Sequence, residues 1–216
     1  MLEVKNVFLS YNKDYFTLHD ISFLIKNNEQ LTIVGNNDSG KSSLCRVIVG
    51  LDKVNKGSIF INDINIEKID FKNDIELGYI PTEFAFLNRK SIKQNLEYVL
   101  KIRNLNKDTI AVKVANALVN YNLEIIKNEK IKNLNYFEKI KVAIARLSLR
   151  NISVFIIDDI FAKLDSKEKT EICGYLKKLI KYNNATALIL CSDEETADLF
   201  GYKKKKLNYG TLENYN

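Results

Sequence analysis

The hydrophobic positions of this 216-residue chain follow two different periods. Apolar residues alternate with polar ones over Leu2 to Ser10, His19 to Ile25 and Ser58 to Ile61. A period of two is typical of a strand that buries one face, so these three stretches predict half-buried strands. Their position near the N-terminus predicts an antiparallel β portion there.

Three further stretches are almost continuously apolar: Gln30 to Gly35, Ser153 to Asp158 and Thr186 to Cys191. Strands that are apolar on both faces belong in the centre of a covered, largely parallel sheet. Between the last two lies Ser166 to Tyr182, whose apolar positions recur at helical spacing. Strand, helix and strand in this order predict a crossover unit, and hence an α/β fold with a mainly parallel sheet.

The middle of the chain has a helical pattern. Ser91 and Gln94 are spaced as a capping box, and apolar residues keep helical spacing to Leu105. The stretch from Asp108 to Leu123 repeats this pattern. We therefore expect one domain over residues 1–216, with a core of residues 1–87 and 148–216 and an inserted helical subdomain at 88–147.

Composition narrows the setting of the protein. Hydrophobic residues make up 46% of the chain, enough for a substantial core. No apolar run approaches the length of a membrane span, and the N-terminus lacks the apolar stretch of a signal peptide. The three cysteines, Cys45, Cys173 and Cys191, have neither disulfide nor metal-site spacing, which favours a cytoplasmic location.

The net charge of +6 is densest in the run Tyr202 to Lys206. Such a run can attract an anionic surface. It can also protect an edge strand from pairing with other strands, and we favour this second interpretation.

The segment Gly35 to Ser43, GNNDSGKSS, carries the strongest chemical signal. It fits the phosphate-loop pattern G-x-x-x-x-G-K-[ST], it follows a buried strand, and an apolar-spaced helix comes next. Backbone amides of such a loop converge on phosphates, the lysine Lys41 reaches the β- and γ-phosphates, and the hydroxyl of Ser42 ligates Mg²⁺. The expected nucleotide contacts are Gly35, Asn36, Asn37, Asp38, Ser39, Gly40, Lys41, Ser42 and Ser43.

Two acidic residues extend this prediction. Asp38 stands in the loop where glycine is common, and it can adopt left-handed backbone angles, so the loop can form, although a carboxylate there weakens phosphate binding. Asp158 ends a buried strand, where it can hold Mg²⁺ through water or, alternatively, cap the next helix. We expect ATP and Mg²⁺ as ligands, with Ser42 and Asp158 at the metal.

With these motifs in place, the chain resembles the ATP-binding subunits of ABC transporters from about Met1 to Gly210. The order of the phosphate loop, LGYIPTE, VAIAR, IIDD and AKLD carries the resemblance. It implies a P-loop NTPase core with a helical subdomain, and it implies that Tyr11 stacks on adenine. From the residues alone, Tyr11 can equally be an anchor at the end of a strand.

Three positions depart from the chemistry of that family. The resemblance implies a glutamate base where Asp159 stands, a glutamine at Thr82 and a histidine at Ser192. The aspartate is shorter by one C–C bond of about 1.5 Å, and a misplacement on that scale can cost about a hundredfold in rate. The only histidine, His19, falls in a predicted strand, where we expect a structural role.

The ATP-sensing signature also differs, since LSGGQ is replaced by LNYFE with Tyr136 and Phe137 at its centre. Glycine lets the backbone approach a phosphate, and two large rings do not. Asn135 and Glu138 still form a capping box for the following helix. We therefore predict slow or absent hydrolysis, with ATP acting as a dimer clamp.

The resemblance also implies partners. We expect a transmembrane permease subunit, a homodimer or a heterodimer with a sister ATP-binding subunit, and a peripheral location on the inner face of the membrane. The alternative is a scaffold outside transport that regulates an envelope complex. We expect no nucleic-acid partner, because the chain lacks the sustained heptads of coiled-coil ATPases. Phe84 and Phe86 either line a groove for the permease or pack within the lobe.

Overall fold

The computed structural model describes residues 1–12, 16–69 and 77–215. These residues form two compact units. The first comprises Met1–Thr82, Ile152–Ala162 and Ile180–Asn216, and the second comprises Glu83–Asn151 and Lys163–Leu179. The division predicted from the sequence, a core of 1–87 and 148–216 with a lobe at 88–147, stays a prediction.

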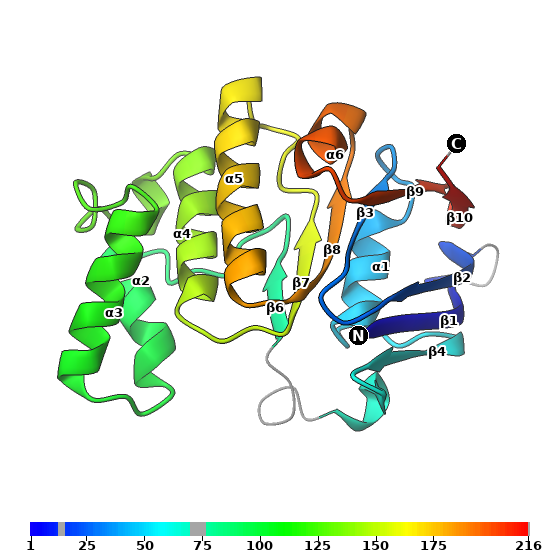
Figure 1. Cartoon of the computed structure of the whole chain (residues 1–216), viewed down its shortest axis with the longest axis horizontal. Coiled ribbons are helices and arrows are strands. Elements are labelled where there is room, and N and C mark those ends of the chain that lie inside the picture. The colour runs from blue at the N-terminus through cyan, green and yellow to red at the C-terminus, as the bar shows by residue number, and fades with distance from the viewer. Residues whose placement is uncertain (13–15, 70–76, 216) are drawn as a thin grey trace. The chain divides into compact units, whose positions relative to one another are not determined.

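An antiparallel sheet opens the first unit, as the period-two pattern predicts. Its strands follow the order β2, β1, β4 and β5 among the described residues (Figure 1). Their bounds are Leu2–Leu9 for β1, Leu18–Ile25 for β2, Lys56–Ile61 for β4 and Ile64–Asn65 for β5. Buried positions alternate along β2, with Ile21, Phe23 and Ile25 facing the core. Pleating alone sends those residues to one face.

A second, mainly parallel sheet completes the first unit. Within the described chain its order is β10, β9, β3, β8, β7 and β6, and only β10 runs antiparallel to its neighbour. The bounds are Gln30–Val34 for β3, Leu77–Ile80 for β6, Val154–Asp158 for β7, Thr186–Cys191 for β8, Lys203–Asn208 for β9 and Thr211–Asn214 for β10. Every residue of β7 and β8 is buried, which confirms the α/β fold expected from the apolar runs.

Strand order overturns our interpretation of the lysine run. The strand β9 that contains it pairs with β3 on one side and with β10 on the other, so it is not an edge strand. Lys203 lies 3.7 Å from Glu29, and Lys205 donates a hydrogen bond to the Asn214 side chain. Pairing with β10 could not be read from the lysines, because the short strand that covers them follows later in the sequence.

Helix α1, Lys41–Ile48, follows β3 and supplies the apolar layer beside the parallel sheet. Leu44 and Ile48 are fully buried in one core cluster with Ile33, Ile156 and Leu188. Helix α6, Glu194–Phe200, follows β8 and begins at an Asp193 cap. A short 3-10 helix, Ile66–Lys68, lies between β5 and β6. The phosphate loop is thus attached to a buried strand and a buried helix.

The second unit is helical. It contains α2 at Ile92–Lys101, α3 at Lys107–Asn120, a 3-10 turn at Ile131–Asn133, α4 at Tyr136–Ser148 and most of α5 at Ser166–Tyr182. The predicted capping box of α2 is present, with Ser91 and Gln94 exchanging hydrogen bonds of 3.0 and 3.2 Å. Within the described residues, no helix combines the length and the apolar character that crossing a bilayer requires.

Candidate nucleotide-binding site

The phosphate loop leaves the sheet at Gly35, whose amide donates to the Cys191 carbonyl at 3.1 Å. A Cβ on Gly35 would lie 2.5 Å from the Ser39 hydroxyl oxygen and 2.7 Å from the Leu207 carbonyl oxygen. Neither distance is compatible with a side chain. Glycine is therefore required here by close packing.

Two residues of the loop have left-handed backbone angles, Asp38 at φ 63° and Gly40 at φ 101°. The sequence-based expectation that Asp38 permits the loop is confirmed, because short polar residues enter this region at modest cost. The side chains of Asn36, Asn37 and Asp38 are exposed, whereas Ser39 is buried. The Asp38 carboxylate therefore sits on the open side of the loop, in solvent.

Helix α1 starts without a side-chain cap and has no acidic residue in its first turn. The first amides of a helix have no partner within it, and the helix dipole places partial positive charge there. The buried hydroxyl oxygen of Ser39 also has no hydrogen-bond partner within the described chain. Together these groups provide donors that an anion can accept.

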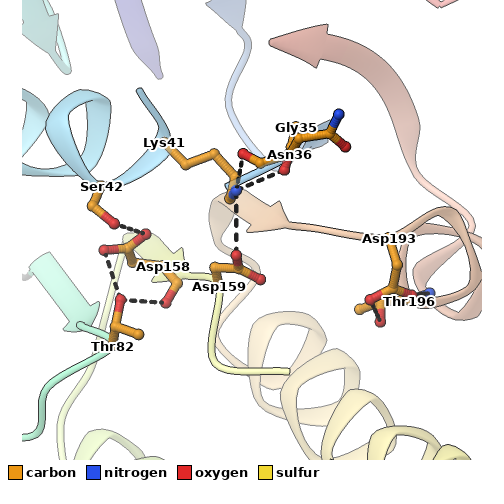
Figure 2. A network of polar contacts seen from close by, with 9 residues as sticks. All are labelled: Gly35, Asn36, Lys41, Ser42, Thr82, Asp158, Asp159, Asp193 and Thr196. Carbon is orange, nitrogen blue, oxygen red and sulfur yellow. Dashed lines mark hydrogen bonds and ion pairs between the residues drawn. The ribbon is translucent and has the colours of Figure 1, made fainter. Parts of the chain in front are cut away.

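Lys41 is 5% exposed, and its ammonium group is held by three oxygen atoms. It donates to the carbonyl of Gly35 at 2.6 Å and to that of Asn36 at 2.8 Å. It also lies 3.3 Å from the Asp159 carboxylate (Figure 2). The lysine is thus folded back over its own loop, at the mouth of the amide cradle.

Asp158 ends β7, as the sequence predicts, and two hydroxyl groups donate to it. Ser42 contacts its Oδ1 at 3.1 Å, and Thr82 contacts its Oδ2 at 3.2 Å, as Figure 2 shows. Burial raises the pKa of this carboxyl, while the Ser42 and Thr82 hydroxyl groups oppose that change. The contact with Ser42 brings together the two residues predicted to hold Mg²⁺, which are 116 positions apart in the chain.

Asp159 directs its carboxylate at Lys41, a contact the sequence gave no sign of. Its backbone has φ 38°, and its amide donates to the Leu190 carbonyl at 3.0 Å. One carboxylate oxygen, Oδ2, pairs with Lys41, and the other, Oδ1, is buried without a hydrogen-bond partner among the described groups. The role of Asp159 as a weak replacement for the glutamate base stays a prediction.

Ser192 directly follows β8, the strand that pairs with β3 next to the phosphate loop. In that register Cys191 lies opposite Val34, so Ser192 leaves the sheet beside Gly35. The next residue, Asp193, caps α6 by accepting hydrogen bonds from the amide and hydroxyl of Thr196 (Figure 2). Ser192 is therefore positioned by a strand end and a helix start, and its predicted role stays untested.

Tyr11 lies beside the start of α1, with its hydroxyl 3.4 Å from that of Ser43. It also donates to the Asp52 carboxylate at 2.6 Å, and the ring is 59% exposed. The sequence analysis missed Asp52 as well as Arg46, which binds the same carboxylate. Their spacing on either side of the end of α1 was the only available signal. His19 lies in β2 with its ring near those of Phe8 and Phe16.

The altered signature lies in the second unit, at the start of α4. Asn135 and Glu138 exchange the predicted capping-box hydrogen bonds, at 2.8 and 3.0 Å. The ring of Tyr136 lies 5.6 Å from that of Phe84, with the Lys163 ammonium 5.3 Å from its centre. Phe137 carries Lys141 at 5.1 Å. Both rings are thus engaged by neighbours in their own unit.

Phe84 and Phe86 pack within the second unit, one of the two alternatives that the sequence left open. Their ring centres are 5.4 Å apart, and the Arg146 guanidinium lies 5.4 Å from the centre of the Phe86 ring. Arg146 also donates to the Ala85 carbonyl at 2.7 Å. These contacts place the turn at 84–86 against α4.

The residues of the first unit fit a magnesium-bound triphosphate. A hydroxyl and a carboxylate are oxygen donors of the kind that Mg²⁺ prefers, and Ser42 and Asp158 supply them side by side. Uncapped helix amides and the ammonium of Lys41 suit phosphate oxygens. The space that Gly35 leaves free of a side chain lets the backbone approach its ligand closely.

Comparison with known proteins agrees with this geometry. The family profile described as ABC transporter matches residues 18–162. An sn-glycerol-3-phosphate import ATP-binding protein of Bartonella bacilliformis is 29% identical over 212 residues, 98% of this chain and 61% of that protein. Its counterpart in Ruegeria pomeroyi is 29% identical over 202 residues, 94% of this chain and 57% of that protein. The chain thus spans about three-fifths of these relatives.

Solved structures extend the comparison. The dimeric bacterial ABC transporter cassette MJ0796 has a TM-score of 0.88 at 25% identity, covering 99% of this chain and 97% of that one. The same cassette in a dimeric post-hydrolysis state bound to ADP and Pi has a TM-score of 0.87 at 25% identity, with the same coverage.

Proposed function

We propose, because this chain belongs to the ABC transporter family, that it binds Mg²⁺–ATP at its phosphate loop as the ATP-binding subunit of a transport complex. The observation that carries the proposal is the meeting of Lys41, Ser42 and Asp158 at one glycine loop. Each group has the chemistry that the ligand needs at that point. The relative bound to ADP and Pi supports the same assignment.

Each residue has a distinct part in binding. The amides from Gly35 to Ser43 and the Lys41 ammonium bind the phosphates, and Lys41 must leave Asp159 to do so. Ser42 and Asp158 hold the metal. Mg²⁺, when bound, neutralises the charge that builds up on the β- and γ-phosphate oxygens. Tyr11 presents its exposed ring beside the loop, where an adenine can stack.

We further propose that ATP acts mainly as a clamp between two subunits, with slow hydrolysis. The relatives that are dimeric cassettes support a dimer, formed by two copies or with a sister subunit. Asp159, Thr82 and Ser192 replace the residues that aim water in this family. The pairing of Asp159 with Lys41 supports a poor base, because a carboxylate engaged by an ammonium attracts protons weakly.

The rings of Tyr136 and Phe137 support the same proposal from the other subunit's side. In this family the signature reaches the γ-phosphate held opposite, and a Cβ-free backbone is needed there. In a homodimer, both composite sites would combine weak water positioning with an aromatic signature. With an intact sister, the sister's site would meet these two rings.

A titration tests ATP binding. Isothermal calorimetry with Mg²⁺–ATP should give a saturable signal for the wild-type protein and none for Lys41→Ala, because the ammonium is the main cationic contact. Lys101→Ala, at an exposed lysine of α2, is the matched control and should bind as the wild type does. An equal response from the wild type and Lys41→Ala would contradict the proposed site.

A restoration series tests hydrolysis. Typical turnover numbers are near 10 per second, and a misplaced base costs about a hundredfold, so we expect phosphate release at about 0.1 per second or slower. The triple variant Asp159→Glu, Thr82→Gln and Ser192→His should be faster. Rapid release by the unaltered chain, lost in Lys41→Ala, would refute slow hydrolysis.

The membrane partner is tested separately. We expect co-purification to recover a multi-span permease, which would place the chain on the inner, cytoplasmic face of the membrane through that subunit. Recovery of soluble proteins alone would support the alternative, an ATP-dependent scaffold outside transport. The altered signature is the observation that keeps this alternative open.

A further inference from the structure

An ion pair at the end of α1 is the feature that the function proposed above leaves unused. Arg46 binds Asp52 through both nitrogen–oxygen pairs, each 2.7 Å long. The amide of Asp52 also donates to the Arg46 carbonyl at 3.3 Å, so backbone and side chain fix the same residue. A two-pronged contact of this kind sets direction as well as distance, because the guanidinium is planar.

The carboxylate held in this way receives the hydroxyl of Tyr11. The distance of 2.6 Å is short for a hydroxyl bound to an ionised acceptor, as expected for a charge-assisted hydrogen bond. The hydrogen bond to Arg46 lowers the pKa of Asp52, so this group stays an acceptor at neutral pH. Burial and the Asp52 contact raise the pKa of Tyr11, so the phenol stays a donor.

The geometry around the ring excludes a purely structural anchor as the best explanation. The Tyr11 ring is 59% exposed, so the hydrogen bond holds a largely open aromatic face and not a core residue. Its hydroxyl also lies 3.4 Å from that of Ser43, within the phosphate loop pattern. Because Ser43 and Arg46 both belong to α1, the same helix carries the phosphate-binding residues and the support of the ring.

We infer that Asp52 and Arg46 are positioning residues that fix the ring of Tyr11 as a preformed stacking surface for the nucleobase. The inference rests on the proposed function, since it assigns a support to the adenine side of that same site. An aromatic side chain fixed before binding loses less conformational entropy when the base stacks on it. The pair therefore contributes to affinity for a nucleotide and not to affinity for its phosphates.

The test compares two ligands that differ in the base, Mg²⁺–ATP and Mg²⁺–tripolyphosphate, by calorimetry. Asp52→Asn and Tyr11→Phe should each weaken ATP binding about three- to ten-fold, the cost of fixing one side chain. Tyr11→Ala should weaken it about ten-fold or more, because the stacking ring is lost. All three variants should bind tripolyphosphate within about two-fold of the wild type, since the phosphate loop is unchanged.

Two further comparisons separate positioning from stability. The double variant Tyr11→Phe with Asp52→Asn should be no weaker for ATP than the weaker single variant, because both break one hydrogen bond. Tyr182→Phe, at a tyrosine that is 87% exposed in α5, is the matched control and should change neither ligand. If Asp52 only stabilised the end of α1, both ligands would weaken equally.

The outcomes also distinguish this inference from the proposed function. A wild-type protein that binds neither ligand would refute the nucleotide site itself. A wild-type protein that binds both, with Tyr11→Phe and Asp52→Asn leaving ATP affinity unchanged, would overturn the positioning role alone. Additive losses in the double variant would do the same, since they would show that the two groups act separately.

Discussion

The buried contact between Lys41 and Asp159 gives the most demanding prediction. Their side chains are 6% and 11% exposed, and the charged atoms are 3.3 Å apart. With an effective dielectric constant of about 20, Coulomb's law gives an attraction of roughly 5 kcal/mol at this distance. The two carbonyl groups that Lys41 retains and the cost of removing both charges from water reduce the net coupling, which we expect to be about 2 kcal/mol.

A double-mutant cycle measures this coupling. Lys41→Met, Asp159→Asn and the double variant are unfolded by urea in buffer free of nucleotide and magnesium. Lys41→Met should be the most destabilised, because it leaves the carboxylate buried and unpaired, and Asp159→Asn should partly restore stability in that background. Far-UV circular dichroism and tyrosine fluorescence should report coincident transitions, which the calculation requires.

An exposed pair provides the control. Lys101 and Glu97 in α2 are closer, at 2.8 Å, but the lysine side chain is 61% exposed. We expect a coupling of about 0.3–0.5 kcal/mol there, and less in 1 M salt, which screens exposed charges. If the Lys41–Asp159 coupling were no larger than this, the two charges would not be engaged in solution. The explanation of Asp159 as a poor base would then lose its support.

Three further predictions concern single residues of the site. Gly35→Ala should lower both stability and Mg²⁺–ATP affinity, because its Cβ has no room, whereas Gly174→Ala in α5, with nothing within 4 Å, should raise the free energy of unfolding by about 0.5–1 kcal/mol; urea unfolding checks both. Asp38→Gly should tighten Mg²⁺–ATP binding, because it removes a carboxylate near the phosphates and the left-handed angle of a non-glycine residue; calorimetry at equal salt would contradict this if affinity fell. Burial raises the folded-state pKa of Asp158 above its ordinary value of 3.8, so the folded protein binds the proton more tightly than the unfolded chain, and stability is lost as pH rises through the interval between the two values. Asp158→Asn should therefore be more stable than the wild type in magnesium-free buffer at pH 7, with an advantage that shrinks as the pH approaches 4; a constant difference across that range would refute the assignment.

The sequence by itself determined the parts of this protein that rest on local physics. The phosphate loop is one contiguous segment, and its glycines, lysine and serine are fixed by the turn and helix start that they form. The capping boxes at Ser91 and Asn135 were predictable for the same reason, since their partners are three residues away. Continuous apolar runs likewise predicted the buried strands β7 and β8, because only the centre of a sheet can hide both faces.

Only the tertiary structure decided which distant groups meet. Asp159 pairs with Lys41 because β7 and β3 run parallel in one sheet, on either side of β8, and no local pattern encodes that order. The lysine run became an interior strand because β10 pairs with it, which corrected our interpretation. Tyr11 acquired its support from Asp52 across a turn and a helix. Local sequence specifies which elements form, whereas strand order and packing specify which side chains share a site.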